Sequence, residues 1–132
     1  MAALSEMGEP AVRVVIVDDQ EPFRVAARMV VELTDGFEVV GEADSGEASV
    51  ELTRQLEPDL VLMDVNLPGM NGLEATRQIL ATTLHTHVLV LSTYEPQDYE
   101  LRAVEAGAIG YVAKSAFGPD ALVEAWEAAT AA

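Results

Sequence analysis

The 132-residue sequence contains no cysteine, a single lysine and few aromatic residues, which make up 5% of the chain. Without cysteine the protein can form neither a disulfide bond nor a thiolate metal site, and the lack of disulfide bonds fits a cytoplasmic protein. Long apolar runs are also absent, because the longest are of strand length and a transmembrane helix needs about 20 residues. The N-terminal residues lack the basic start and the long apolar core of a signal peptide. These absences favour a cytoplasmic protein without a membrane segment.

Positive charge is scarce as well: seven lysine and arginine residues stand against 23 aspartate and glutamate residues, for a net charge of -16. A field of that sign repels nucleic-acid phosphates and anionic lipid headgroups, so we expect no direct binding to nucleic acid or to membranes. Half of the residues are hydrophobic, which is enough for a folded core. A chain of this length has room for one domain. We assign that domain to residues 11–130, after a loose N-terminal tail of residues 1–10, and expect no second domain.

Apolar runs alternate with helix-like stretches along the whole chain, without repeats, low-complexity segments or linkers. Strict alternation predicts right-handed crossovers and a parallel sheet with helices on both faces. The predicted fold class is α/β, a doubly wound five-stranded parallel sheet of the flavodoxin-like type, with the strand order 2-1-3-4-5. The predicted strands are residues 12–19, 37–43, 60–64, 87–92 and 109–114.

Short signals predict how the intervening helices begin and which side of them faces the core. Asp44 and Glu47 have the spacing of a capping box at the start of the second helix, and Asn71 precedes the third helix as its cap. In the fourth helix we expect Leu101 and Val104 to face inward.

Polar residues stand at the carboxyl ends of the apolar strands. In a doubly wound sheet of this order, ligands bind outside the carboxyl ends, at the switch point between the first and third strands. Three carboxylates should therefore converge there, with a hydroxyl group and an ammonium group on neighbouring strands. The residues are Asp18 and Asp19 at the end of the first strand, Asp64 at the end of the third, Ser92 and Thr93 at the fourth, and Lys114 at the fifth.

This set of side chains favours phosphoryl chemistry. Two carboxylates about 4 Å apart repel by roughly 4 kcal/mol at an effective dielectric constant of 20, so three of them need protons or a cation. A hard divalent cation with oxygen ligands, magnesium or manganese, fits that requirement. With the cation bound, Asp64 can stay ionised and act as a nucleophile toward a phosphoryl group, while Lys114 holds the phosphoryl oxygens.

Together these residues resemble the receiver (CheY-like) domains of two-component response regulators. The motifs are "VVIVDDQEPFR", "PDLVLMDVNLPGMNGLE", "VLVLST" and "EAGAIGYVAKS", in the order and spacing of that family. The resemblance extends from about Val12 to Ala129. The sequence is most similar to the NarL/FixJ (LuxR-type) subfamily, whose receivers are usually followed by a helix-turn-helix domain.

The resemblance implies a role for each residue of the set. Asp64 is the implied phosphorylation site, and the phosphoryl donor is the phosphohistidine of a sensor histidine kinase. Such a protein is a phospho-acceptor that catalyses only its own phosphorylation and dephosphorylation, and is not otherwise an enzyme. The other implied roles are Mg²⁺ ligation by Asp19 and Asp64, by Asp18 largely through water and by the backbone carbonyl of Asn66, phosphoryl binding by Lys114 and Ser92, and a switch aromatic at Tyr111.

The resemblance also implies an output. Phosphorylation would bias the surface of the fourth helix, fifth strand and fifth helix toward a downstream protein partner or a homodimer. Thr93 is bulkier than the small residue that many receivers carry, and we hypothesise that it slows hydrolysis of the phosphoryl group. Nothing after Ala129 could be a DNA-binding domain, so we expect a stand-alone receiver. The alternative is the receiver part of a longer LuxR-type DNA-binding transcriptional regulator.

Two other classes of protein share parts of this pattern. A haloacid-dehalogenase-type phosphatase also forms an aspartyl phosphate, but it needs a second aspartate two residues after the nucleophile, where this chain has Asn66. A flavodoxin-type electron carrier needs a loop rich in hydroxyl groups and glycine after the first strand. The sequence "DDQEPF" at that place is acidic and would repel a flavin phosphate.

Overall fold

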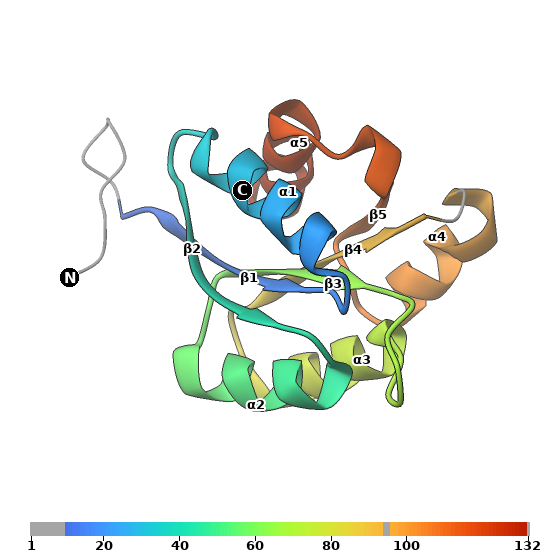
Figure 1. Cartoon of the computed structure of the whole chain (residues 1–132). Helices are drawn as coiled ribbons and strands as arrows, with labels where there is room; N and C mark the ends of the chain where they lie inside the picture. Colours follow the sequence, from blue (N-terminus) through green and yellow to red (C-terminus); the bar gives the residue numbers. More distant parts are fainter. Residues whose placement is uncertain (1–9, 94–95, 132) are drawn as a thin grey trace.

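Five parallel strands form a sheet through the middle of the molecule, and helices cover both of its faces (Figure 1). This computed structural model describes residues 10–93 and 96–131. No helix in that part of the chain is both long and apolar enough to cross a membrane. The elements are β1 (Val12–Val17), α1 (Glu21–Glu32), β2 (Phe37–Ala43), α2 (Gly46–Leu56), β3 (Leu60–Asp64), α3 (Gly72–Thr82), β4 (His87–Ser92), α4 (Pro96–Glu105), β5 (Gly110–Ala113), the 3₁₀-helix η1 (Lys114–Ala116) and α5 (Pro119–Thr130).

The strand order is β2-β1-β3-β4-β5, and every pair of neighbours is parallel. The predicted fold class and strand order are thereby confirmed. Strands β1 and β3 lie side by side, with Val17 opposite Met63, so the chain segments that follow these two strands meet at one edge. Strand β2 is at the border of the sheet and is only partly buried, as its more polar sequence requires.

The central strands are buried on both faces because their side chains alternate between two cores. One core lies between the sheet and helices α2, α3 and α4, and the other lies between the sheet and helices α1 and α5. Figure 1 shows α1 and α5 on one side of the sheet and α2 and α3 on the other. Strand β3 illustrates the alternation, because Val61 and Met63 belong to the first core and Leu60 and Leu62 to the second.

The prediction for the inner face of α4 was wrong. Leu101 and Val104 are 70% and 54% exposed, whereas Ala103 and Ala106, the residue that follows α4, are buried in the core on this side of the sheet. Tyr99, four residues before Ala103, also packs on this core. The buried side of α4 is therefore the side that carries Tyr99 and Ala103, and not the side of the larger aliphatic residues. Alanines let α4 lie close to β5, and larger side chains at those positions would hold the helix away from the sheet.

The predicted N-cap of α2 was wrong by one residue. Ser45, rather than Asp44, is the N-cap, and its hydroxyl oxygen accepts a hydrogen bond from the backbone N–H of Ala48 at 3.1 Å. Strand β2 ends at Ala43 as predicted, but α2 begins at Gly46, one residue later than a cap at Asp44 implies. The prediction for α3 is confirmed, because the Asn71 side chain accepts a hydrogen bond from the N–H of Glu74 at 2.9 Å.

Candidate functional site

Three aspartates meet where β1 and β3 end. Asp18 and Asp19 follow β1 directly, and Asp64 is the last residue of β3. Carboxylate oxygens of these three residues all lie within 4.8 Å of one another. Asp18 and Asp64 are buried, whereas Asp19 is exposed. The predicted convergence of the carboxylates at the switch point is therefore present in the structure.

The segment after β3 is built so that α3 begins close to Asp64. The backbone N–H of Gly72, the first residue of α3, donates a hydrogen bond to the carbonyl of Val65 at 2.9 Å. A Cβ atom at Gly72 would lie 1.9 Å from the Asp64 carbonyl oxygen, so only glycine allows this approach. Gly69, with a φ of +71°, turns the intervening loop. The buried strand and the tight return together fix the place where the Asp64 side chain emerges.

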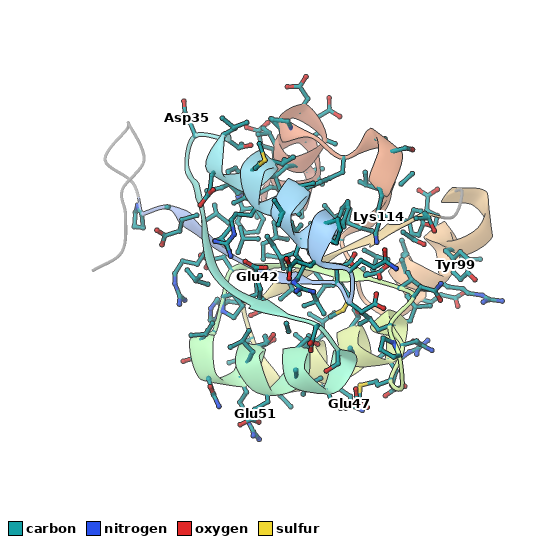
Figure 2. All side chains as sticks on the ribbon, viewed as in Figure 1. Asp35, Glu42, Glu47, Glu51, Tyr99 and Lys114 are labelled. Atoms are coloured by element: carbon teal, nitrogen blue, oxygen red, sulfur yellow. The ribbon has the colours of Figure 1, made fainter. Side chains whose placement is uncertain are left out.

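Lys114 stands directly after β5, in the first position of η1, and its ammonium group reaches the aspartates. The Nζ atom lies 2.5 Å from Oδ2 of Asp18 and 3.6 Å from Oδ1 of Asp64. It also lies 4.4 Å from the centre of the Phe23 ring on α1, a cation–π contact. Figure 2 shows Lys114 beside the beginning of α1. The only lysine of the chain thus forms part of the acidic cluster.

The electrostatics of the cluster favour a cation. Burial raises the pKa of the Asp64 carboxyl group, and the neighbouring Asp18 carboxylate raises this pKa further. The Lys114 ammonium and a hydrogen bond from the N–H of Asn66, at 3.3 Å, lower the pKa of Asp64 without reversing the shift. One ammonium group cannot balance three carboxylates, and oxygen donors of this kind suit a hard divalent cation. The residues present therefore fit Mg²⁺ or Mn²⁺.

A cavity of about 230 Å³ opens over Asp64. Its size leaves room for a small anionic group beside the carboxylate. Thr93, which we hypothesise to slow hydrolysis of the phosphoryl group, is exposed and lines this cavity. The lining residues are Asp19, Gln20, Asp64, Asn66, Thr93 and Lys114.

The two predicted switch residues lie on the strands next to β3. Ser92 is the last residue of β4, fully buried, and one position beyond Leu91, which pairs with Asp64 in the sheet. Tyr111 on β5 is 8% exposed, and its ring stacks on the ring of Tyr99 from α4, with centroids 6.5 Å apart and planes within 8°. The structure therefore links the strand that ends next to Lys114 to helix α4 through an aromatic pair.

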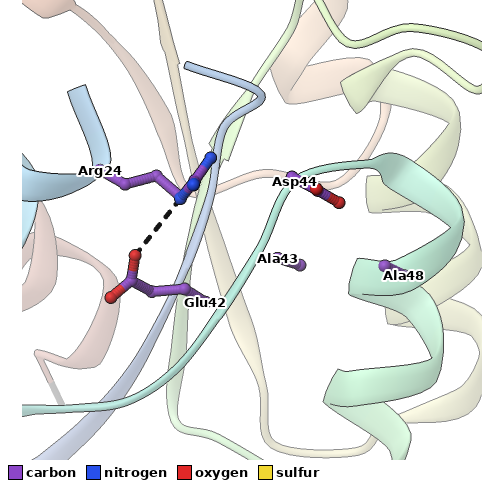
Figure 3. Close-up of a pocket in the computed structure, with 5 residues that line it drawn as sticks. All are labelled: Arg24, Glu42, Ala43, Asp44 and Ala48. Atoms are coloured by element: carbon purple, nitrogen blue, oxygen red, sulfur yellow. Dashed lines mark ion pairs between the residues drawn. The ribbon is translucent and has the colours of Figure 1, made fainter. Parts of the chain in front are cut away.

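Arg24, on α1, also belongs to the site, although it was not predicted from the sequence. Its Nη1 donates a hydrogen bond to the backbone carbonyl of Asp18 at 2.7 Å, and its Nε lies 3.3 Å from Oε1 of Glu42. Figure 3 shows this ion pair beside a hollow of about 330 Å³, which is lined also by Ala43, Asp44 and Ala48. The sequence holds only a weak signal for this ion pair, which is an arginine early in α1 and a glutamate late in the neighbouring strand β2.

Comparison with known proteins identifies the class of this chain. Residues 14–127 match the family described as Response regulator receiver domain, and the chain belongs to that family. It is similar to the transcriptional regulatory protein DegU of Brevibacillus brevis, with 38% identity over 91% of this chain and 50% of the relative. It is also similar to the response regulator GacA of Pseudomonas viridiflava, with 43% identity over 80% of this chain and 49% of the relative.

Solved structures agree with this assignment. A two-component response regulator of the LuxR family from Aurantimonas sp. SI85-9A1 superimposes with a TM-score of 0.82 at 38% identity, covering 90% of this chain and 84% of that one. The structural and sequence neighbours place the chain among receivers related to LuxR-type regulators. The chain spans about half the length of the curated relatives that it matches.

Proposed function

We propose that this receiver is controlled by phosphorylation of Asp64, and that the phosphoryl group comes from the phosphohistidine of a sensor histidine kinase. The observation that carries the proposal is the position of the Asp64 carboxylate. It is buried at the end of a central strand, opens onto a cavity, and lies within 3.6 Å of the only lysine. The class of protein supports the same conclusion, because the chain belongs to the receiver family.

The proposed chemistry is a transfer from nitrogen to oxygen. A carboxylate oxygen of Asp64 attacks the phosphorus atom, the phosphorus–nitrogen bond breaks, and its electron pair stays on the imidazole nitrogen, which takes up a proton. Asp64 must be ionised for this step, which its raised pKa opposes. Lys114 favours the ionised form and can then pair with the phosphoryl oxygens. The protein would act as a phospho-acceptor that catalyses only its own phosphorylation and dephosphorylation.

In this proposal Asp19, Asp64 and the backbone carbonyl of Asn66 would hold Mg²⁺, and Asp18 would act largely through water. When bound, the cation offsets the negative charge of the carboxylates and of the incoming phosphoryl group. Asp19 is the exposed member of the cluster, so its carboxylate is accessible from solvent. The ion pair between Asp18 and Lys114 holds the Asp18 carboxylate at the site, beside Lys114.

The proposed output passes from Ser92 and Tyr111 to the surface of α4, β5 and α5. A phosphoryl group on Asp64 brings strong hydrogen-bond acceptors and carries about two negative charges, where the ionised carboxylate carried one. Ser92 is on the neighbouring strand and can donate to those acceptors after a small shift of the end of β4. Because Tyr111 stacks on Tyr99 of α4, a rearrangement of this aromatic pair would change the surface. A protein partner or a second copy of the chain would bind there.

The form in which the receiver works is also part of the proposal. The strongly acidic charge disfavours direct contact with DNA, so we propose a cytoplasmic receiver that acts through a protein partner. The half-length match to the curated relatives supports the alternative of a receiver within a longer LuxR-type regulator. An immunoblot of cell extract with an antibody against this chain distinguishes the two forms by their apparent mass.

The phosphorylation is tested by intact-mass measurement after incubation with acetyl phosphate and Mg²⁺. We expect a phosphoryl adduct on the wild-type chain that is lost in Asp64→Asn and without Mg²⁺. Asp35→Asn is the matched control, because it removes an exposed carboxylate at the opposite end of the sheet and should leave the adduct unchanged. Steady turnover of varied phosphoesters would favour the phosphatase alternative, and a wild-type chain that forms no adduct would contradict the proposal.

A further inference from the structure

Arg24 connects three parts of the fold at the acidic cluster. It lies near the start of α1, donates to the backbone carbonyl of Asp18 in the loop after β1, and pairs with Glu42 near the end of the edge strand β2. The Arg24 and Glu42 side chains are only 18% and 23% exposed. An ion pair that is this well shielded from water and also bonded to the backbone holds its geometry better than a surface pair.

The hydrogen bond from Arg24 acts on the peptide group between the first two aspartates. The carbonyl oxygen of Asp18 belongs to the planar unit that also contains the N–H of Asp19. Holding this oxygen at 2.7 Å therefore fixes the orientation of the backbone from which the Asp19 side chain leaves. Asp18 has further contacts of its own, with the N–H of Gln20 at 2.8 Å and with Lys114. The exposed Asp19 depends more on its backbone.

We infer that Arg24 is a positioning residue for the Mg²⁺ site, and that it acts through the Asp18 carbonyl to orient the carboxylate of Asp19. This inference rests on the proposed function, which assigns Mg²⁺ to the acidic cluster. Groups that orient metal ligands commonly affect metal affinity nearly as much as the ligands do. Arg24 itself is a cation and coordinates nothing, so its effect has to pass through the hydrogen bond.

Simple charge repulsion predicts the opposite sign. A guanidinium group close to a metal site repels the incoming cation, and its removal would tighten Mg²⁺ binding if charge alone mattered. Loss of positioning would weaken Mg²⁺ binding instead. The direction of the change in affinity therefore separates the two explanations.

The chain provides a matched control in Arg28, one turn later on α1. Arg28 pairs with the other carboxylate oxygen of Glu42 and is 43% exposed. Arg24→Gln and Arg28→Gln therefore each remove one positive charge and one ion-pair partner of Glu42. They differ in the hydrogen bond to the Asp18 carbonyl, which Arg24 donates.

The test is calorimetric titration of the full chain with Mg²⁺ alone. We expect Arg24→Gln to weaken binding by about tenfold, the lower end of the range for groups that orient metal ligands. Arg28→Gln should stay within about twofold of the wild type, as for exposed ion pairs. The backbone amide signal of Asp19 in a nitrogen-15 spectrum should shift in Arg24→Gln and stay in place in Arg28→Gln, before any metal is added.

The outcomes separate the inference from the proposed function. Equal or tighter Mg²⁺ binding by Arg24→Gln, or an equal loss in Arg28→Gln, would overturn the role of Arg24 while the wild type still binds Mg²⁺. A wild-type chain that does not bind Mg²⁺ would overturn the metal assignment itself, and this inference with it. If Arg24→Gln does not fold, as its melting temperature without metal would show, Arg24→Lys replaces it, with a smaller loss expected in the same direction.

Discussion

Replacing Asp64 with asparagine should stabilise the metal-free protein at neutral pH, although it removes the central group of the site. The substitution preserves the shape of the side chain and removes one negative charge from a buried cluster. Burial and the Asp18 carboxylate both raise the pKa of Asp64, which means that its ionised form is unfavourable in the folded state. Asparagine carries no such charge and therefore avoids the cost.

The size of the effect follows from opposing charge interactions. With oxygens within 4.8 Å, Asp18 repels an ionised Asp64 by about 3.5 kcal/mol or more at an effective dielectric constant of 20. Lys114, at 3.6 Å, attracts it by about 4.6 kcal/mol on the same scale. The interactions with Asp18 and Lys114 largely cancel, so the burial of the charge, with a smaller repulsion from Asp19, decides the sign. Lys114 keeps its ion pair with Asp18 in this variant, so no buried charge is left unpaired. We therefore expect a net gain on the order of 1 to 3 kcal/mol, within the range found when buried ion pairs are replaced by neutral side chains.

The gain should depend on pH in a defined direction. A carboxyl group whose pKa is raised by folding stabilises the folded state while it is protonated, below its unfolded pKa. That stabilisation is lost as the pH rises through the folded pKa. The advantage of Asp64→Asn over the wild type should therefore be full above the raised pKa of Asp64 and disappear in acid. Saturating Mg²⁺ should also reduce the advantage, because it stabilises the wild type by about 2.7 kcal/mol at a hundred times its Kd.

Thermal unfolding followed by circular dichroism, in the presence of a chelator, measures this difference. A gain of 1 to 3 kcal/mol corresponds to a rise in Tm of roughly 3 to 12 °C for a domain of this size. Asp19→Asn is the control, since it removes a charge from the same cluster at an exposed position and should change Tm much less. Two results would refute the reasoning. One is an Asp64→Asn protein that is no more stable than the wild type at neutral pH, and the other is a stability advantage of this variant that is as large in acid as at neutral pH.

Three further substitutions test the scaffold and the access to the site. Gly72→Ala places a Cβ atom 1.9 Å from the Asp64 carbonyl oxygen and should cost about 3 kcal/mol or more, whereas Gly118→Ala, with open space around it, should cost far less in the same chemical-denaturation assay. Asn71→Ala removes the side-chain cap of α3 and should lower the unfolding free energy by about 1 kcal/mol; an unchanged value would show that the cap is dispensable. Thr93→Ala should shorten the lifetime of the phosphorylated protein, measured by loss of the adduct over time, and an unchanged or longer lifetime would contradict the proposed role of Thr93.

Much of the site could be predicted because its position follows from local patterns. The apolar run Leu60–Asp64 is too continuous for a half-exposed strand, and so Asp64 had to emerge from the centre of a parallel sheet. Alternation of strands and helices then brought the residues after β1 to the same edge. The pairing of Lys114 with Asp18 as well as with Asp64 could not be predicted, since it depends on the path of the side chain past the Phe23 ring.

The inner face of α4 and the role of Arg24 show where local patterns are insufficient. Leu101 and Val104 have the hydrophobicity of core residues, but the distance between α4 and the sheet selects Ala103 and Ala106 instead. Hydrophobicity along a helix does not encode that distance. The contact of Arg24 with a backbone carbonyl leaves no trace in the sequence, because every residue has such a carbonyl.

The sequence by itself determined the fold class, the order of the strands and the identity of the acidic residues at their carboxyl ends, because hydrophobic periodicity and strand alternation act over short stretches of chain. Only the tertiary structure decided which side of α4 is buried, which aspartate Lys114 approaches most closely, and that Arg24 holds the peptide group between Asp18 and Asp19. These features depend on distances between elements that are far apart in the sequence, and such distances are set by the packing of the whole core.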